Sequence, residues 1–217
     1  MTILINIIVT FFVLSIMSLS SSGLKVIIVS GNGCTRPIRT CNWYGWMQDQ
    51  LTESNLFSDV ILQNMPDPVE AKESIWIPHI INNLGADANT IIIGHSSGAE
   101  ACLRLLEKNK LYGAVLVSAC HTDLGMASEK ISGYYSRPWD WSSIKNNAGD
   151  FGILQLHSTD DPFIPIHEAD HVASSLKLNN NEYIKYNDRS HFFDENAIKE
   201  LPLMIINKVK QLKNNEL

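Results

Sequence analysis

The chain has 217 residues, of which 45% are hydrophobic and 18% charged, and its formal net charge is −6. A chain of this length and apolar content can bury one substantial core, so we expect one globular, monomeric domain rather than a disordered protein. Lysine and arginine are scattered and form no basic stripe. Composition therefore excludes the electrostatic footprint of a nucleic-acid-binding protein.

The first 23 residues differ in character from the rest. Residues 1–24 contain no charged side chain, and residues 3–17 are almost wholly apolar. This run is short for a membrane span, which needs about 20 apolar residues, but it suits the core of a signal peptide. Small residues follow it at 18–23, where cleavage would occur. We treat residues 1–23 as an apolar leader and assign the domain to residues 24–217.

A second interpretation of the leader is that translation starts at Met17, because no Lys or Arg precedes the apolar core. The compartment depends on which interpretation holds. A signal peptide predicts a secreted or ER-lumenal protein, and a start near Met17 predicts a cytoplasmic one.

Beyond the leader, short apolar runs alternate with helical patterns, as in a parallel α/β sheet. In chain order the sequence predicts strand 25–30, helix 43–51, strand 59–63, helix 73–84, strand 90–93, helix 99–110, strand 112–119, an irregular stretch 120–138, helix 139–146, strand 152–157, helix 165–176, strand 182–186 and helix 196–212. The prediction is a doubly wound, mostly parallel sheet of about six strands with helices on both faces.

The most informative motif is Gly94-His95-Ser96-Ser97-Gly98, a G-x-S-x-G between a β-branched run and an amphipathic helix. In a nucleophile elbow the serine sits on a tight turn between strand and helix, above the helix N-terminus. Flanking glycines are needed where strand and helix approach too closely for side chains. The motif alone also occurs by chance, but its position at a strand–helix junction predicts a serine hydrolase with Ser96 as nucleophile.

Two later strand ends carry the matching acid and base. The fifth predicted strand is followed by Asp160 and Asp161, and the sixth by His191. Ligands of such sheets bind beyond the carboxyl ends of the strands, and serine, acid, histidine is the chain order of the α/β-hydrolase triad. We therefore predict His191 as general base and one of the two aspartates as the group that orients its ring. By position either aspartate qualifies, and either could instead cap the following helix.

Backbone amides are expected to bind the oxyanion that forms during attack. The N–H of Ser97 lies directly after the nucleophile, and the first strand ends in the flexible turn Gly31-Asn32-Gly33. We predict the N–H groups of Asn32 and Ser97 as the two donors. The mechanism needs no cofactor and no metal.

A competing motif is the literal H-E-x-x-H at residues 167–171, which on a helix would place His167 and His171 one turn apart as zinc requires. A zinc peptidase acting through His167, Glu168 and His171 is therefore an alternative. No third ligand follows at the usual spacing, and the motif follows a turn that already supplies the triad acid. A further alternative is a non-catalytic interaction module on the same fold.

The four cysteines fall into two groups. Cys34 and Cys41 bracket one loop and would close it as a disulfide in an oxidising compartment. Cys102 and Cys120 have the character of small core residues. The sequence leaves the pairing of Cys34 with Cys41 open.

A set of motifs, in this order over about residues 24–213, closely resembles the retinoblastoma-binding protein 9 family of small α/β-hydrolase-fold serine hydrolases. They are Gly31-Asn32-Gly33, Trp43-Tyr44-Gly45-Trp46, Asn64-Met65-Pro66-Asp67-Pro68, Glu73-Ser74-Ile75-Trp76, the elbow, Gly133-Tyr134, Arg137-Pro138-Trp139 and Ser158-Thr159-Asp160-Asp161-Pro162-Phe163. The resemblance implies an α/β-hydrolase fold and a triad of Ser96, Asp161 and His191. It also implies hydrolysis of an ester, thioester or amide (peptide) bond in a small-molecule or peptide substrate.

The chain departs from that family at the L-x-C-x-E motif associated with retinoblastoma-protein binding. The motif would fall at residues 84–88, where its cysteine and glutamate are missing, so we do not expect this partner. Tyr134 lies within the irregular stretch after the fourth strand, and Trp139 directly follows it. We predict them as walls of an apolar substrate pocket, although such aromatics more often pack in a core.

Overall fold

The computed structural model describes residues 23–215 of the chain. Six strands form one sheet in the order β2-β1-β3-β4-β5-β6, and every neighbouring pair is parallel. The strands are β1 (Lys25–Val29), β2 (Asp59–Leu62), β3 (Thr90–His95), β4 (Gly113–Val117), β5 (Gly152–Ser158) and β6 (Tyr183–Tyr186). The predicted six-stranded parallel α/β architecture is confirmed. The predicted leader lies outside the described residues except for Gly23.

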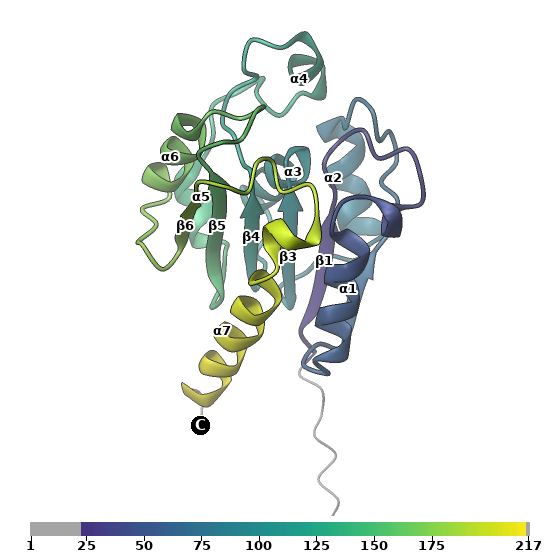
Figure 1. The fold of residues 1–217 in the computed structure, drawn as a ribbon, viewed down its shortest axis with the longest axis vertical. Helices are drawn as coiled ribbons and strands as arrows, with labels where there is room; N and C mark the ends of the chain where they lie inside the picture. The colour runs from purple at the N-terminus through teal and green to yellow at the C-terminus, as the bar shows by residue number, and fades with distance from the viewer. Residues whose placement is uncertain (1–22, 216–217) are drawn as a thin grey trace, which may run out of the picture.

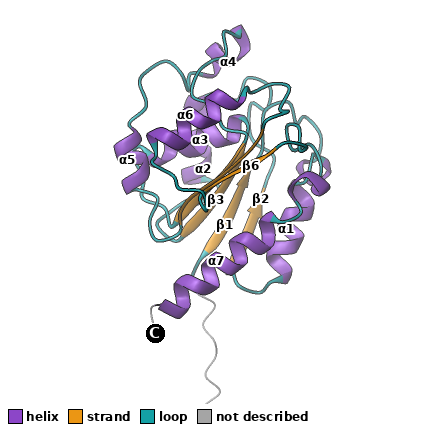
Figure 2. Cartoon of the chain, turned by 60° about the vertical axis from the view of Figure 1, so that its left-hand side comes forward, coloured by secondary structure: helices purple, strands orange, loops and turns teal. Residues whose placement is uncertain are grey.

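Helices cover both faces of the sheet (Figure 2). One face carries α1 (Tyr44–Glu53) and α7 (Leu201–Asn215). The other carries α2 (Glu73–Asn82), α3 (Ser97–Leu106), α5 (Trp141–Asn146) and α6 (Ile166–Ser175). The short helix α4 (Ala127–Ser132) projects beyond one end of the sheet (Figure 1). Within residues 23–215 no helix combines the length and apolar character that crossing a membrane would need.

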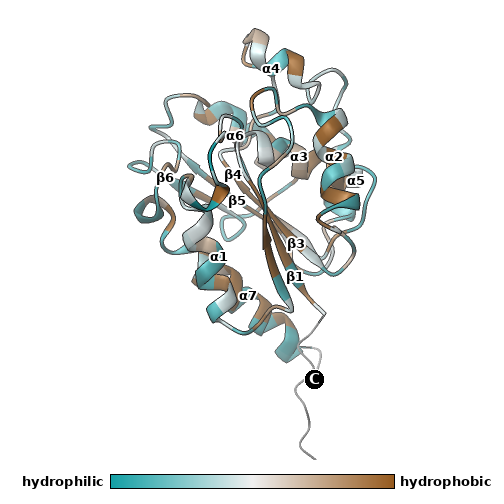
Figure 3. Cartoon of the chain, turned by 90° about the vertical axis from the view of Figure 1, so that its right-hand side faces the viewer, coloured by the Kyte–Doolittle hydropathy of each residue, from teal (hydrophilic) through white to brown (hydrophobic). Residues whose placement is uncertain are grey.

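Each central strand supplies residues to two separate cores. Ile27 and Val29 of β1 pack on the α2/α3 face, whereas Val26 and Ile28 pack on the α1/α7 face. Alternate residues of a strand point to opposite faces, so a sheet covered on both sides requires continuous apolar runs. Figure 3 shows these strands as the most hydrophobic part of the molecule. This explains why the β-branched runs of the sequence predict the strands well.

The order of the strands creates a switch point. The chain passes from β1 to β2 on one side and then crosses to β3 on the other side of β1. Loops leaving the carboxyl ends of β1 and β3 therefore diverge, and open sheets of this kind bind ligands in the crevice between them.

Two segments differ from the sequence-based expectation. The stretch 120–138 contains α4, which ends at Gly133 in the left-handed conformation, with a φ of 86°. The predicted helix 196–212 is instead a 3-10 turn, Glu195–Ile198, followed by α7. A single helix would bring the ring of Pro202 against the carbonyl of Ile198. The helix therefore restarts so that Pro202 falls in its first turn.

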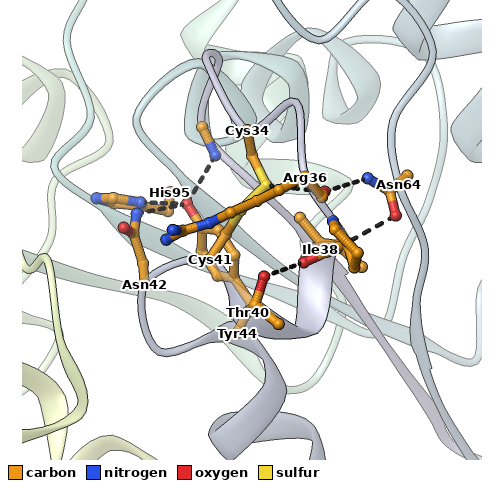
Figure 4. The surroundings of a disulfide bond; sticks show 11 residues. Cys34, Arg36, Ile38, Thr40, Cys41, Asn42, Tyr44, Asn64 and His95 are labelled. Atoms are coloured by element: carbon orange, nitrogen blue, oxygen red, sulfur yellow. Dashed lines mark hydrogen bonds between the residues drawn. A yellow bond between two sulfur atoms is a disulfide. The ribbon is translucent and has the colours of Figure 1, made fainter.

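Cys34 and Cys41 are joined in a disulfide that closes a loop between β1 and α1 (Figure 4). The loop is also held to the β2–α2 segment, because the Asn64 side chain accepts from the Ile38 N–H and donates to the Arg36 carbonyl. Cys102 and Cys120 are free and buried, as the sequence indicates.

Removing the disulfide is expected to destabilise the fold. In the chain-entropy model, a cross-link spanning so few residues contributes about 2 kcal/mol by restricting the unfolded chain. The double variant Cys34→Ser/Cys41→Ser should therefore unfold at lower urea concentration than the parent. Adding a reductant should lower the midpoint of the parent and leave that of the double variant unchanged. Equal stability of parent and double variant would contradict the assigned bond.

Candidate active site

Ser96 occupies a strained turn between β3 and α3. Its φ of 52° and ψ of −126° lie outside the regions that non-glycine residues normally adopt. The turn is held by the Ser96 N–H, which donates to the Val117 carbonyl at 2.9 Å. A Cβ on Gly94 would lie 2.2 Å from the Gly98 carbonyl oxygen, and one on Gly98 would lie 2.4 Å from that of Val29. The glycines of the G-x-S-x-G motif are therefore required by backbone packing.

His191 lies in the loop after β6 and contacts a carboxylate from the loop after β5. The Nδ1 atom of His191 is 2.8 Å from Oδ2 of Asp161. Ser118, which follows β4, donates its hydroxyl to the same oxygen at 2.9 Å. The other oxygen accepts the N–H groups of Phe163 and Ile164 at 2.9 and 3.0 Å. The carboxylate is therefore fixed by donors on every side.

These hydrogen bonds also determine the charge of Asp161. Burial by itself raises the pKa of Asp161, but the hydrogen bond from His191 and the two backbone N–H groups outweigh it. The pKa of Asp161 therefore lies below its usual value, and the group is ionised at neutral pH. An ionised carboxylate is the form that can accept the Nδ1–H of an imidazole and stabilise the imidazolium.

Asp160, the other candidate acid, has a different task. Its Oδ1 accepts the hydroxyl of Ser158 and, at 2.9 Å, the N–H of Ser190. Asp160 thus holds the loop that precedes His191, while the side chain in contact with the imidazole is that of Asp161.

Ser96 and His191 line one pocket of about 610 Å³. It lies at the carboxyl ends of β1 and β3, the switch point of the sheet, and α4 forms part of its wall. Three of its lining side chains are large exposed hydrophobics, Met126 (48%), Phe163 (57%) and Phe193 (45%). The rings of Phe163 and Phe193 lie 5.1 and 5.5 Å from that of His191, centroid to centroid. The imidazole is therefore flanked by an apolar rim.

The two predicted oxyanion donors lie at the same end of the sheet. Ser97 is the first residue of α3, and Asn32 follows β1 and lines the pocket. In the described part of the chain, neither N–H is donated to an acceptor. A Cβ on Gly31 would lie 3.1 Å from the Cβ of Ser96, so the loop after β1 packs directly against the serine.

The predicted pocket aromatics need a correction. Tyr134 is fully buried in the core beside α3, and its neighbour Tyr135 lines the pocket instead. Trp139 does not line the pocket either. Its ring covers the guanidinium of Arg104 at 3.6 Å, and its Nε1 donates to the His121 carbonyl. Tyr134 therefore belongs to the core, and the partly buried Trp139 packs against it.

The H-E-x-x-H match falls in α6 and is engaged in other contacts. The Glu168 carboxylate accepts the N–H groups of His121 and Thr122 at 2.9 and 3.1 Å. The ring of His171 stacks on that of His121, and His167 is exposed. Among residues 23–215, no three His, Cys, Asp or Glu side chains come together as a metal site would require. Glu168 instead holds the chain that leaves β4.

Comparison with known proteins shows the family of the chain. A family model described as serine hydrolase matches residues 26–206. The chain belongs to the serine hydrolase family. The serine hydrolase RBBP9 of Rattus norvegicus is 45% identical over 172 residues, which cover 79% of this chain and 89% of the rat protein. The resemblance indicated by the sequence motifs is thereby confirmed.

More distant relatives share the fold. The putative hydrolase YdeN of Bacillus subtilis (strain 168) is 24% identical over 174 residues, 78% of this chain and 87% of YdeN. The crystal structure of the B. subtilis ydeN gene product superposes with a TM-score of 0.70 at 21% identity, covering 88% of this chain and 99% of that one. Arabidopsis thaliana SOBER1 gives a TM-score of 0.54 at 15% identity, with 86% and 99% coverage. This serine hydrolase therefore has an α/β-hydrolase fold.

Sequence reasoning missed three contributors to the site. Ser118 stands at the end of β4, so inspecting every strand end would have found it. Phe163 ends one of the family motifs but has no predicted role, and Phe193 belongs to no motif, although both rings lie next to His191.

Replacing the second glycine of the elbow should destabilise the whole fold. In Gly98→Ala the new methyl group meets rigid backbone at the end of β1, so we expect a loss of about 3 kcal/mol, the upper end of the usual range for overpacking. Gly125→Ala is the matched control, because Gly125 has a φ of 71° with open space around it and should cost only about 1 kcal/mol. Thermal unfolding measures both. Equal losses of stability would show that the close approach of α3 to β1 is not the constraint.

Proposed function

We propose that this family member hydrolyses an ester, thioester or amide bond through an acyl-enzyme, as a carboxylesterase- or peptidase-like enzyme. Ser96 is the nucleophile, His191 the general base and acid, and Asp161 the group that orients His191. The observation that carries the proposal is the 2.8 Å contact of His191 with the buried Asp161 carboxylate, in a pocket that also contains Ser96.

The hydrogen-bond pattern supports the proton transfers this reaction needs. Because Oδ2 of the ionised Asp161 only accepts, Nδ1 of the neutral His191 ring carries the proton and donates it, which leaves Nε2 unprotonated. Nε2 takes the hydroxyl proton of Ser96 as its oxygen attacks the carbonyl carbon of the substrate. His191 then gives that proton to the leaving oxygen, sulfur or nitrogen, and the acyl group stays on Ser96.

The second half of the reaction uses the same groups. Water gives a proton to Nε2 of His191 and attacks the acyl carbon, and Ser96 recovers its proton as the acid product leaves. In both halves negative charge develops on the carbonyl oxygen. The unengaged N–H groups of Asn32 and Ser97 are the proposed donors to it, and one such donor contributes about 3 kcal/mol to lowering the barrier.

The pocket suggests a substrate with an apolar group next to the scissile bond. A volume of about 610 Å³ suits a small molecule or a few residues of a peptide. Met126, Phe163 and Phe193 present apolar surface at its rim. Burial of an acyl or side-chain group against them would supply about 25 cal/mol for each Å² removed from water.

A fluorophosphonate probe tests the nucleophile directly. We expect it to label the unmutated protein and to leave Ser96→Ala unlabelled, because the probe phosphonylates only an activated serine. As a control, the thermal unfolding midpoint of Ser96→Ala should equal that of the parent, which shows that the variant is folded. A metal chelator should leave hydrolysis of a p-nitrophenyl ester unchanged, whereas it would abolish the activity of a zinc peptidase. A folded parent that is not labelled would refute the catalytic proposal and favour a binding module on the same fold.

Substitutions of the two neighbouring aspartates should have different effects on kcat. Asp161→Asn removes the acceptor that fixes the His191 tautomer, and we expect kcat on a p-nitrophenyl ester to fall by about 10⁴-fold. Asp160→Asn keeps the imidazole contact and loosens only the loop before it, so a loss of about tenfold or less is expected. An Asp160→Asn enzyme as impaired as Asp161→Asn would show that the acid has been assigned to the wrong residue.

A further inference from the structure

A set of four hydrogen bonds joins the loop after β1 and the loop after β6 through side chains of α1 and β3. His95, which directly precedes Ser96 and is 1% exposed, has its Nε2 atom 2.9 Å from the His191 carbonyl oxygen. Its Nδ1 atom lies 2.7 Å from the hydroxyl oxygen of Tyr44 in α1. That oxygen accepts the N–H of Gly31 at 2.9 Å and the side-chain amide of Asn42 at 3.2 Å. Tyr44, His95 and Asn42 meet beside the disulfide loop in Figure 4.

The position of every hydrogen in this set follows from its partners. A carbonyl oxygen only accepts, so Nε2 of His95 must carry a proton. In the neutral ring Nδ1 is then an acceptor, and the hydroxyl of Tyr44 donates to it. The lone pairs of that hydroxyl accept from Gly31 and Asn42. We call the path from the Gly31 N–H through Tyr44 and His95 to the His191 carbonyl the Tyr44–His95 relay.

The relay stays in this protonation state over the range in which a hydrolase works. Burial lowers the pKa of His95 to about 3, and the neighbouring His191 adds to the effect. Burial also raises the pKa of Tyr44 to about 12. Because both groups remain neutral, no change of solution pH near neutrality reverses a donor or an acceptor.

The two ends of the relay are attached to different parts of the proposed machinery. Gly31 directly precedes Asn32, the proposed oxyanion donor of the loop after β1. At the other end the acceptor is the backbone of His191 itself. A parallel contact supports this end, since Nε1 of Trp43 donates to the Phe192 carbonyl at 2.9 Å. One pair of side chains thus connects the oxyanion loop with the histidine loop.

We propose that Tyr44 and His95 are positioning residues of the hydrolytic reaction. They set the place of the Asn32 N–H and of the His191 imidazole relative to Ser96 at the same time. This inference rests on the function proposed above. A displacement of about 1 Å at a reacting group can cost about 100-fold in rate, so residues that fix two such groups should have a large effect on kcat.

The first experiment compares two tyrosine-to-phenylalanine variants. Tyr44→Phe removes the hydroxyl of the relay, whereas Tyr183→Phe removes an equally short bond, to Asp170 at 2.8 Å, from the edge strand β6. With a p-nitrophenyl ester we expect Tyr44→Phe to lower kcat about tenfold to 100-fold with little change in KM. Tyr183→Phe should keep the parent kcat. Equal kcat for the two variants, with the parent labelled by fluorophosphonate, would overturn the positioning role alone.

A second pair of variants separates positioning from simple packing. The side-chain amide of His95→Gln can donate to the His191 carbonyl and accept from Tyr44, whereas His95→Leu can do neither. We expect His95→Gln to keep a kcat about tenfold or more above that of His95→Leu. Equal kcat values in these two variants would mean that only the volume of the side chain matters, and the relay would be refuted.

The protonation of the His95 ring can be measured by NMR, independently of any assay of enzyme activity. In ¹⁵N-histidine-labelled protein, His95 should show a protonated Nε2 and an unprotonated Nδ1, with no titration between about pH 5 and pH 9. A titrating His95, or the opposite tautomer, would overturn the relay even in an active enzyme. A parent that fluorophosphonate does not label would instead overturn the proposed function, which keeps the two failures distinct.

Discussion

The structure depends most on the close approach of α3 to β1 beneath the turn that carries Ser96. A side-chain carbon on Gly94 or Gly98 would lie less than 2.5 Å from a backbone oxygen, so the turn exists only because both residues are glycines. The approach forces Ser96 to a φ of 52° and leaves the Ser97 N–H without an acceptor in the described chain. Strain and an unengaged donor are both costs to folding, and in the proposed mechanism this donor would stabilise the oxyanion.

The other residues of the proposed site lie at the same edge of the sheet as Ser96, because all the parallel strands end there. Ser118, Asp161 and His191 follow β4, β5 and β6 respectively, and their side chains form one continuous path of hydrogen bonds. A buried carboxylate without partners would cost several kcal/mol, but here donors from separate segments share the charge. The same contacts that keep Asp161 ionised also hold the three loops together.

The strands and the serine turn could be predicted from the sequence. Buried parallel strands appear as unbroken apolar runs, and the close packing at the elbow requires glycines at fixed positions. Pattern and position alone could not decide between Asp160 and Asp161, since adjacent residues at a strand end share the same pattern and differ only in where the loop turns them. Only the family resemblance favours Asp161. The break before α7 occurs at Pro202, which the helical pattern alone does not exclude. Which of the adjacent residues Tyr134 and Tyr135 faces the pocket depends on the conformation of the loop after α4, and that conformation leaves no pattern in the sequence. The hydrogen bonds of His95 could not be predicted because its partners, Tyr44 and His191, lie 51 and 96 residues away in the sequence.

The disulfide and the Tyr44–His95 relay bridge the same gap, between the loop after β1 and the start of α1. The disulfide of Cys34 and Cys41 is a covalent link across this segment, and the hydrogen bond from the Gly31 N–H to Tyr44 is a second link. Asn42, next to Cys41, adopts a φ of 45° and donates to the same hydroxyl, so the covalent link also orients a member of the hydrogen-bond set. A loop of this length beside the proposed nucleophile would ordinarily be mobile. Here the cross-link restricts that loop, and the hydrogen bonds extend the restriction to His95 and the backbone of His191.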